Sequence, residues 1–177
     1  MKSIMEIAAL TGVEGFLHPS EADMLMTLAS GKDVLEIGIY MGLSAFCMAT
    51  VAKSIHCVDT FRANTAGQQQ MQALTTLDQF LAATRRFNNV THFVGTSEEA
   101  SNRIVSHYDM VFLDAMHDYE SVKVDIGRWH RRVRAGGIMV FHDYGHAAFP
   151  GVKQAVDEIF SPQTNTLVTL MWMDKKV

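Results

Sequence analysis

The stretch DVLEIGIYMGLS, residues 33–44, decides how the rest of the chain is interpreted. It begins as an apolar strand over 33–37, passes two glycines four residues apart, and continues into a helix rich in small residues over 43–52. Glycines at this spacing allow a tight turn and a close approach of the backbone to a ligand. The N-terminus of the following helix faces whatever binds there. The stretch predicts a strand–turn–helix unit with a ligand site at Gly38–Gly42, a purely structural glycine turn being the alternative.

Outward from this stretch, short apolar strands alternate with helices. Strands are expected at 33–37, 54–58, 90–94, 108–113, 138–141 and 166–173. Helices are expected at 18–31, 43–52, 74–87, 97–105, 119–133 and 151–160. This alternation is typical of a parallel sheet with helices on both faces. Open sheets of this kind bind ligands beyond the carboxyl ends of their strands, so the residues after each strand are the candidates for chemistry.

Composition describes a globular chain with an ordinary core. The 177 residues are 48% hydrophobic and 19% charged, and the formal net charge of −4 argues against a general binder of nucleic-acid phosphates. The only two cysteines, Cys47 and Cys57, are too few for a disulfide framework, so a cytoplasmic location is expected. No signal peptide and no apolar run of about 20 residues is visible, so no membrane partner is expected. The sequence leaves a homo-oligomer open.

Two acidic residues narrow the ligand at the turn. Glu36 lies in the strand just before it, where a carboxylate would repel a pyrophosphate but suits an amino group. Asp59 follows the second strand, 21 residues after Gly38, and an acid at this place binds ribose hydroxyls, with a helix-capping role as the alternative. The turn lacks the third glycine of the dinucleotide fingerprint and the Gly-Lys-Ser/Thr of a P-loop. An amino group and a ribose without a pyrophosphate match S-adenosylmethionine better than NAD.

Polar residues also follow the fourth and fifth expected strands. Asp114 ends one apolar run, His117 follows three residues later, and His142-Asp143 ends the next run. If these strands are neighbours, the side chains converge on one edge of the sheet, where carboxylates and an imidazole suit a divalent cation. Ordinary capping of the strand ends is the alternative. His117 is also a candidate general base, because an imidazole with a pKa of about 6.5 can take a proton from a hydroxyl at neutral pH.

In combination, these motifs resemble a class I S-adenosylmethionine-dependent methyltransferase. The matching segments are EIGIYMGLS (36–44), VDT (58–60), GTS (95–97), LDAMHDY (113–119) and GGIMVFHDY (136–144), with PGV at 150–152. More narrowly, they resemble the group with Asp-x-x-His-x-Tyr after the fourth strand and His-Asp-Tyr after the fifth. The resemblance covers nearly the whole chain. It implies one domain over 1–177, with an N-terminal helical segment at 1–31 and a cofactor-binding α/β core at 32–177.

The resemblance implies a Rossmann-like three-layer sandwich. Its mostly parallel sheet would have the order 3-2-1-4-5-7-6, with an antiparallel last strand. The segment after Phe160 has room for one good strand and a stub of another, so the terminal hairpin is expected to be trimmed.

The resemblance also implies roles for individual residues. S-adenosylmethionine would be the cofactor, bound by Glu36, Gly38, Tyr40, Gly42, Ser44, Asp59, Thr60, Thr96, Ser97 and Asp114. A divalent metal, Mg²⁺ or Mn²⁺, would be held by Asp114, His142 and Asp143, with His117 as the catalytic base. His142 stands where related enzymes carry an acid, which weakens a magnesium site and suits softer ions such as manganese, iron or zinc. The alternative is that His142 binds no metal.

The expected activity is O-methylation of a small hydroxylated molecule or sugar. The polar stretch 63–75, with Gln68–Gln70, is interpreted as a loop over the site, a solvated helix being the alternative. A non-catalytic S-adenosylmethionine-binding module stays open as a second function. A nicotinamide-dependent oxidoreductase is less well supported, because the third glycine and a Tyr-x-x-x-Lys pair are missing. No nucleic-acid partner is expected, since the Arg85-Arg86 and Arg131-Arg132 pairs are typical of solvated surfaces.

Overall fold

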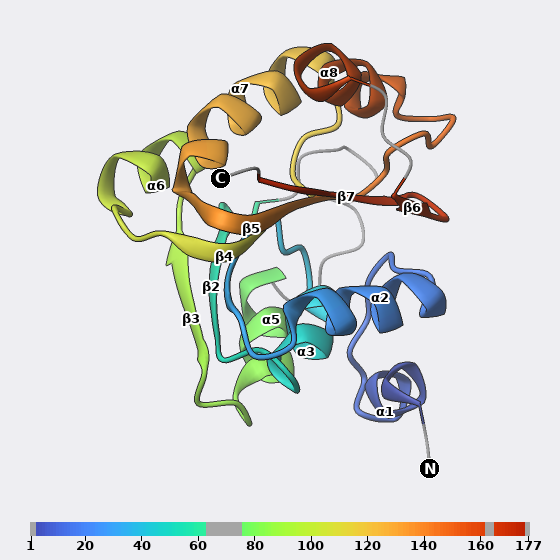
Figure 1. The fold of residues 1–177 in the computed structure, drawn as a ribbon. Coiled ribbons are helices and arrows are strands. Elements are labelled where there is room, and N and C mark those ends of the chain that lie inside the picture. The colour runs from blue at the N-terminus through green and yellow to red at the C-terminus, as the bar shows by residue number, and fades with distance from the viewer. Residues whose placement is uncertain (1–2, 63–75, 162–164, 176–177) are drawn as a thin grey trace.

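A seven-stranded sheet lies between two layers of helices in the computed structural model, which describes residues 3–62, 76–161 and 165–175 (Figure 1). The strands are β1 (Asp33–Ile37), β2 (Ser54–Asp59), β3 (Val90–Val94), β4 (Tyr108–Leu113), β5 (Val133–Phe141), β6 (Thr166–Leu167) and β7 (Leu170–Asp174). Their order is β3-β2-β1-β4-β5-β7-β6. Strand β7 runs antiparallel to β5 and β6, and the other pairs are parallel. This confirms the predicted fold class and sheet order.

The helices divide between the two faces of the sheet (Figure 1). On one face lie α1 (Ile4–Leu10), α2 (Pro19–Ala29), α3 (Leu43–Ala49) and α5 (Thr76–Thr84). On the other lie α6 (Ser97–Arg103), α7 (Tyr119–Trp129) and α8 (Pro150–Phe160), with a short 3₁₀ turn η1 (His130–Arg132) after α7. The stretch 63–75, interpreted above as a loop over the site, lies outside the described residues. No helix in the described part of the chain is long and apolar enough to cross a membrane.

The fifth strand begins earlier than the sequence pattern predicts. The glycines at 136–137 indicate a turn before a strand at 138–141, yet β5 begins at Val133. Val133 pairs with Tyr108, and the register shifts between Tyr108 and Met110 before the regular ladder resumes. A Cβ atom on Gly137 would lie 2.7 Å from the carbonyl oxygen of Asp109. The glycines therefore let an irregular strand pass close to β4, and helix α7 ends correspondingly early.

The C-terminal stretch 166–173 forms a hairpin where the sequence pattern predicts one strand. Val168 has φ +55° in the turn between β6 and β7. Strand β6 has two residues, and each pairs with β7. The hairpin is therefore as short as the length of the segment predicts. Its turn brings Thr169 next to helix α2, where the backbone N–H of Thr169 donates to the Glu21 carboxylate at 2.8 Å.

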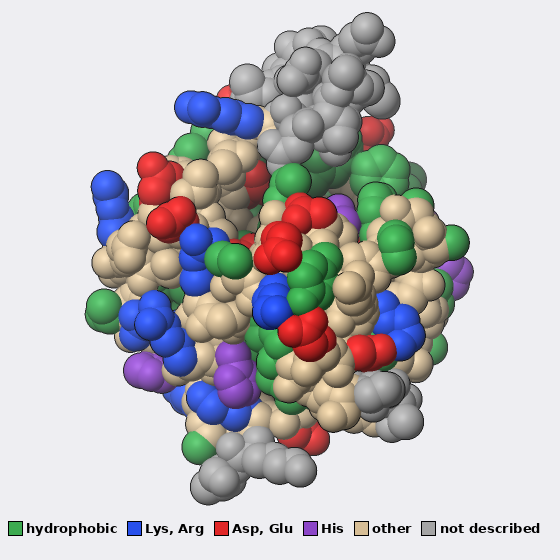
Figure 2. Space-filling model, turned by 90° about the horizontal axis from the view of Figure 1, so that it is seen from above, with side chains coloured by type: hydrophobic (Ala, Val, Ile, Leu, Met, Phe, Trp, Pro, Cys, Tyr) green, Lys and Arg blue, Asp and Glu red, His purple; other side chains and the backbone are tan. Residues whose placement is uncertain are grey.

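Apolar side chains fill both interfaces between the sheet and its helices. Trp129 and Phe141 belong to the cluster beneath α6–α8, and Leu25 and Phe80 to the cluster on the opposite face. The layers bury the central strands on both sides, so β1 is buried from Val34 to Ile37. The outer surface of the α6–α8 layer carries acidic and basic side chains side by side (Figure 2). This packing leaves the carboxyl ends of the parallel strands as the place where polar side chains meet.

Candidate functional site

A cavity of about 930 Å³ opens at the carboxyl ends of β1, β2, β4 and β5. It is where an open α/β sheet is expected to bind a ligand. Most of the residues predicted from the sequence line it: Gly38, Tyr40, Ser44, Asp59, Thr60, Thr96, Ser97, Asp114, His117, His142 and Asp143. Two of the predicted residues, Glu36 and Gly42, are not among the described residues that line the cavity. With Thr96 and Ser97 after β3, the structure brings residues from five strand ends to one space.

The glycine turn after β1 depends on a close approach between two loops. Gly38 has φ +87°, and a Cβ atom there would lie 2.1 Å from the carbonyl oxygen of Asp114. Any side chain at this position would push the loop after β4 away from the cavity. Gly42 has φ +94° and caps the N-terminus of α3, so its conformation ends the turn without its atoms reaching the cavity.

Asp59 holds the turn in shape. Its Oδ2 atom accepts hydrogen bonds from the backbone N–H groups of Ile39 at 2.6 Å and Tyr40 at 3.0 Å. Its Oδ1 atom accepts from the N–H of Phe61 at 2.6 Å. A carboxylate oxygen has two lone pairs, so Oδ2 is saturated and Oδ1 keeps one acceptor position. In this arrangement Asp59 can take one ribose hydroxyl, whereas the sequence analysis expects a pair.

Glu36 is turned away from the cavity. It is completely buried, the Ser44 hydroxyl donates to its Oε1 atom, and the Cys57 thiol lies 3.8 Å from Oε2. Burial raises the pKa of Glu36 to about 8, although the hydrogen bond from Ser44 opposes the shift. The expected contact between Glu36 and the amino group of a ligand is therefore not formed by this geometry. Ser44 lines the cavity, with its hydroxyl engaged by Glu36.

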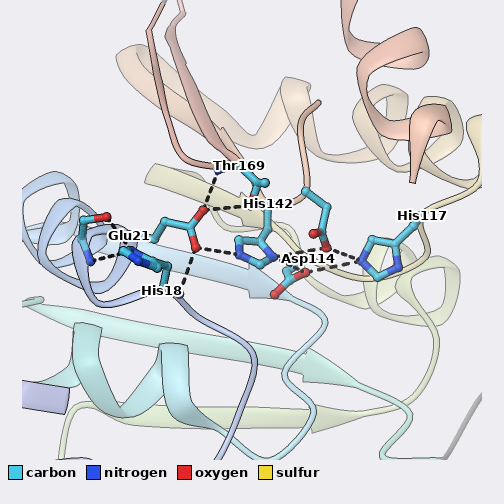
Figure 3. A network of polar contacts seen from close by, with 8 residues as sticks. His18, Glu21, Asp114, His117, His142 and Thr169 are labelled. Atoms are coloured by element: carbon cyan, nitrogen blue, oxygen red, sulfur yellow. Dashed lines mark hydrogen bonds and ion pairs between the residues drawn. The ribbon is translucent and has the colours of Figure 1, made fainter. Parts of the chain in front are cut away.

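Beyond the turn, two carboxylates and an imidazole converge (Figure 3). His117 Nε2 lies 3.0 Å from Asp143 Oδ2 and 3.6 Å from Asp114 Oδ1. One ligand atom from each of these residues lies within 4.8 Å of the others. The buried Nε2 atom has no aligned hydrogen bond, and Asp143 adopts φ +58°, a strained conformation for a residue with a side chain. This donor set suits a divalent cation.

The charges in this cluster are strongly coupled. Burial lowers the pKa of His117, but the nearby carboxylates of Asp114 and Asp143 outweigh it and raise the pKa to about 9. Burial raises the pKa of Asp143, but His117 and His142 outweigh it and hold the pKa well below its usual range. His117 is therefore charged at neutral pH. An imidazolium cannot accept a proton, so its use as a base depends on what else binds at the carboxylates.

His142 lies against the two carboxylates, as the sequence predicts, but outside the candidate metal group. The sequence groups it with Asp114 and Asp143 as a metal ligand, whereas His117 completes the candidate metal group in the structure. His142 Nδ1 lies 3.3 Å from both carboxylates, and its Nε2 lies 3.4 Å from Glu21 on α2. Hydrogen bonds to Asp114, Asp143 and Glu21 outweigh burial and raise the pKa of His142 to about 12. His142 therefore lies behind the cluster as a link to α2.

Sequence reasoning did not identify Glu21. The buried positions of α2 are 21, 22, 25 and 29, so Glu21 is a carboxylate on an otherwise apolar face. That placement is the signal that would have identified it, because a buried charge needs dedicated partners. At the start of the helix Glu21 also forms a capping box with His18.

Aromatic side chains that the sequence analysis did not single out form part of the cavity wall. Phe149 stacks on His117 at 4.3 Å between ring centroids and on His146 at 5.1 Å. Phe16 is 79% exposed and stacks on Tyr40 at 5.6 Å. All five residues line the cavity. A large exposed phenylalanine at the mouth of a cavity indicates a surface that a ligand can cover.

The side of the cavity beside α6 is polar. Thr96 caps α6, and its hydroxyl accepts from the N–H of Glu99 at 3.1 Å. The Ser97 hydroxyl donates to Asp125 Oδ1 at 2.5 Å and accepts from Trp129 Nε1 at 2.8 Å. Burial raises the pKa of Asp125. Ser97 is thus fixed by two partners and presents a rigid edge to the cavity.

Comparison with known proteins places these features in a family. A family model described as "Methyltransferase domain" matches residues 35–144. No curated protein sequence matches the chain.

Similar solved structures share the fold at low sequence identity. An O-methyltransferase from Bacillus cereus in complex with SAH is 14% identical, with a TM-score of 0.65 over 97% of this chain and 89% of that one. The O-methyltransferase TomG from Streptomyces achromogenes, in complex with SAM, is 16% identical, with a TM-score of 0.62 over 93% and 80%. The N-methyltransferase NodS from Bradyrhizobium japonicum is 13% identical, with a TM-score of 0.63 over 89% and 96%.

Proposed function

The chain belongs to the methyltransferase domain family, and we propose that it transfers the methyl group of S-adenosylmethionine to a hydroxyl of a small molecule. One observation carries the proposal. The cavity that contains the glycine turn and Asp59 also contains the cluster of Asp114, His117 and Asp143. The cavity therefore combines a candidate cofactor site with a group that can accept a proton from the acceptor molecule. Cavities of several hundred Å³ hold ligands of this size.

The cofactor would lie along the ends of β1 and β2. Asp59 Oδ1 has one acceptor position for a ribose hydroxyl, and Thr60, Thr96 and Ser97 line the adjoining wall. The Gly38 turn lets the backbone approach the methionine part of the cofactor. These contacts would place the sulfonium methyl in front of the acceptor. Alignment of this kind can supply several kcal/mol of the barrier to an in-line attack.

His117 is the residue proposed to receive the acceptor proton. The acceptor oxygen forms its bond to the methyl carbon while the carbon–sulfur bond breaks, and the hydroxyl proton passes to a neutral imidazole at Nε2. A divalent cation held by Asp114 and Asp143, with His117 outside its ligand set, would lower the pKa of the acceptor hydroxyl and offset the charge that keeps His117 protonated. Phe149 stacks against the His117 ring and fixes its plane.

A hydroxyl acceptor is favoured over an amine. An uncharged amine attacks through its free lone pair, whereas a hydroxyl is a weak nucleophile until its proton is drawn away. An imidazole paired with two carboxylates serves the second case. The same cavity wall carries the aromatic rings of Phe16, Tyr40 and Phe149, so the acceptor would combine a polar reacting group with an apolar body. This description includes hydroxylated aromatic compounds as well as sugar derivatives.

The test is calorimetric titration with S-adenosylmethionine and S-adenosylhomocysteine, each with and without Mg²⁺ or Mn²⁺. We expect binding of both ligands and tighter binding of the metal in the presence of the cofactor. Asp114→Asn should abolish the metal effect, and Asp174→Asn, an exposed carboxylate on β7, is the matched control. Absence of heat and of a thermal shift with both ligands would refute the proposed activity. Cofactor binding that is the same with and without metal would remove the cation from the proposal.

A second step identifies the acceptor class. Formation of S-adenosylhomocysteine is measured with hydroxylated aromatic compounds, sugars and primary amines at equal concentrations. Turnover with hydroxyl acceptors and none with amines is the expected result. Turnover confined to amines would contradict O-methylation. Cofactor binding without turnover across broad acceptor sets would favour the non-catalytic binding module.

A further inference from the structure

Glu21 is a buried carboxylate with no part in the mechanism described above. It is 2% exposed on helix α2, and its two oxygens have different partners. Oε1 accepts from the backbone N–H and the hydroxyl of Thr169, both at 2.8 Å. Oε2 accepts from the backbone N–H of His18 at 3.0 Å and lies 3.4 Å from His142 Nε2. Burial raises the pKa of Glu21, but these hydrogen bonds outweigh it and lower the pKa to about 2, so the group is anionic.

The two oxygens of Glu21 contact different parts of the protein. Oε1 ties helix α2 to the turn between β6 and β7. Oε2 faces an imidazole whose other nitrogen, Nδ1, lies 3.3 Å from Asp114 and 3.3 Å from Asp143 (Figure 3). A line of contacts therefore runs from α2 through His142 to both carboxylates of the candidate site. A carboxylate behind an imidazole fixes the tautomer and the plane of the ring.

We propose that Glu21 is a positioning residue: its Oε2 atom holds His142 with Nε2–H toward α2 and Nδ1–H toward Asp114 and Asp143, and so sets the geometry of the two carboxylates. The consequence for catalysis rests on the proposed function, whereas the orientation of the imidazole does not. Phe112 also restrains the His142 ring, because it packs edge-on against it at 6.4 Å between centroids. Rotation of the ring would take the imidazole away from the buried carboxylate of Glu21, which is costly.

The substitution Glu21→Gln tests the contact with His142. The amide side chain has one acceptor oxygen in place of two, and with that oxygen at the Oε1 position both hydrogen bonds from Thr169 are kept. The NH₂ group then takes the place of Oε2 and faces two donors, the backbone N–H of His18 and Nε2–H of His142. Two donors cannot pair, so the hydrogen bond from His18 is lost and His142 must give up its Nε2 proton or turn away from α2.

The first readout is spectroscopic and needs no activity. Long-range ¹⁵N–¹H spectra of the imidazoles, assigned with His142→Gln, should show a proton on Nε2 in the wild type and its loss from Nε2 in Glu21→Gln. Asp23→Asn is the matched control, since Asp23 is an exposed carboxylate on the same helix, and its spectrum should equal the wild type. An unchanged His142 signal in a folded Glu21→Gln protein would overturn the proposal.

The second readout separates positioning from stability. Glu21→Gln should lower kcat by roughly 10–100-fold and change the Kd for S-adenosylhomocysteine less than about threefold, because the carboxylate geometry is affected and the cofactor wall is not. Thr169→Val removes the hydroxyl hydrogen bond to Oε1 and leaves Oε2 in place. For each degree of Tm that it loses, Thr169→Val should lower kcat far less than Glu21→Gln does.

The outcomes distinguish this proposal from the proposed function. If the two variants lose kcat in proportion to their loss of Tm, Glu21 has a structural role only and the proposal fails. If the wild type binds neither S-adenosylmethionine nor S-adenosylhomocysteine, the proposed function fails, and the imidazole spectra alone decide whether Glu21 orients His142.

Discussion

The side chain of His117 shows how neighbours decide what a residue can do. By itself an imidazole titrates near neutral pH, and the sequence alone predicts a base at this position. Between Asp114 and Asp143 its pKa is raised to about 9, so the same ring holds its proton at neutral pH. The sequence pattern predicts the residue type, while its charge state depends on Asp114 in the same loop and on Asp143 from the next strand end.

The first prediction concerns this side chain. His117→Gln should lower kcat by roughly 10²–10⁴-fold, because a glutamine cannot accept the acceptor proton, and should leave the Kd for S-adenosylmethionine nearly unchanged. Single-turnover kinetics and calorimetry measure the two quantities. His107→Gln, at an exposed position before β4, is the control and should behave as the wild type. A His117→Gln enzyme with wild-type kcat would show that another group takes the proton.

Glu36 leads to a prediction about stability and pH. Its pKa is about 8 in the folded protein against 4.5 for an unperturbed glutamate. Between these values the unfolded chain releases a proton that the folded protein retains, so the contribution of Glu36 to stability is fully present below pH 4.5 and is lost as the pH rises to about 8. The slope reaches at most about 1.4 kcal/mol per pH unit.

The variant Glu36→Gln should remove this part of the pH dependence. Its amide oxygen can still accept from Ser44. The amide has no proton to release in this pH range, so its burial adds no cost that grows with pH. Urea unfolding across this pH range should show Glu36→Gln gaining stability over the wild type as the pH approaches 8. Glu14→Gln, on the surface, is the control. Parallel curves for Glu36→Gln and the wild type would contradict a buried, neutral carboxyl group.

At the scale of elements, the turn between β1 and α3 depends on the loop after β4. The two meet where the Gly38 backbone passes the carbonyl group of Asp114. The glycine spacing predicts a turn from local sequence alone. Its contact with a loop some 76 residues later in the chain requires β1 and β4 to pair, as they do from Val34 and Met110 onward.

Gly38→Ala tests this contact. The added Cβ would meet backbone atoms at 2.1 Å in a conformation with φ +87°, so we expect a loss of at least about 2 kcal/mol in the free energy of unfolding. Gly127→Ala is the contrasting variant. Gly127 lies in α7 with open space around its Cβ position, so alanine should stabilise the protein by about 0.5–1 kcal/mol. Equal effects of the two variants in urea denaturation would contradict the close approach.

At the scale of the whole molecule, a helix near the N-terminus and the hairpin near the C-terminus meet behind the candidate site. Helix α2 and the turn of the β6–β7 hairpin are joined by Glu21 and Thr169, 148 residues apart. His142, at the end of β5, lies between this junction and the two carboxylates. The terminal segments therefore complete the back of a site whose front is built by the central strands.

Hydrogen exchange tests this layered organisation. Strands β1 and β4 are paired on both sides and buried on both faces, so their amide protons should exchange only through global unfolding. Strand β3 forms one edge of the sheet and β6 the other, and their amides should exchange faster by several orders of magnitude. Equal protection of β3 and β1 in native-state exchange would show that the sheet opens as one unit.

The sequence by itself determined the alternation of strands and helices, the glycine turn, and the residue types at the strand ends. These follow from local rules, since burial periodicity, capping and turn chemistry act over a few neighbouring residues. The early start of β5 and the division of the stretch 166–173 into a hairpin did not follow from local sequence. Both arise from pairing partners, Tyr108 for β5 and β7 for the terminal stretch.

The hydrogen-bond partners of the polar residues depend on the tertiary structure. Glu36 faces Ser44 behind the turn, Asp59 holds the turn by its own hydrogen bonds, and His142 points back to Glu21 on a helix 121 residues earlier in the chain. No local pattern encodes these directions. A side chain's partners are set by which strand ends lie next to each other, and the electrostatics of a buried group depend on those partners.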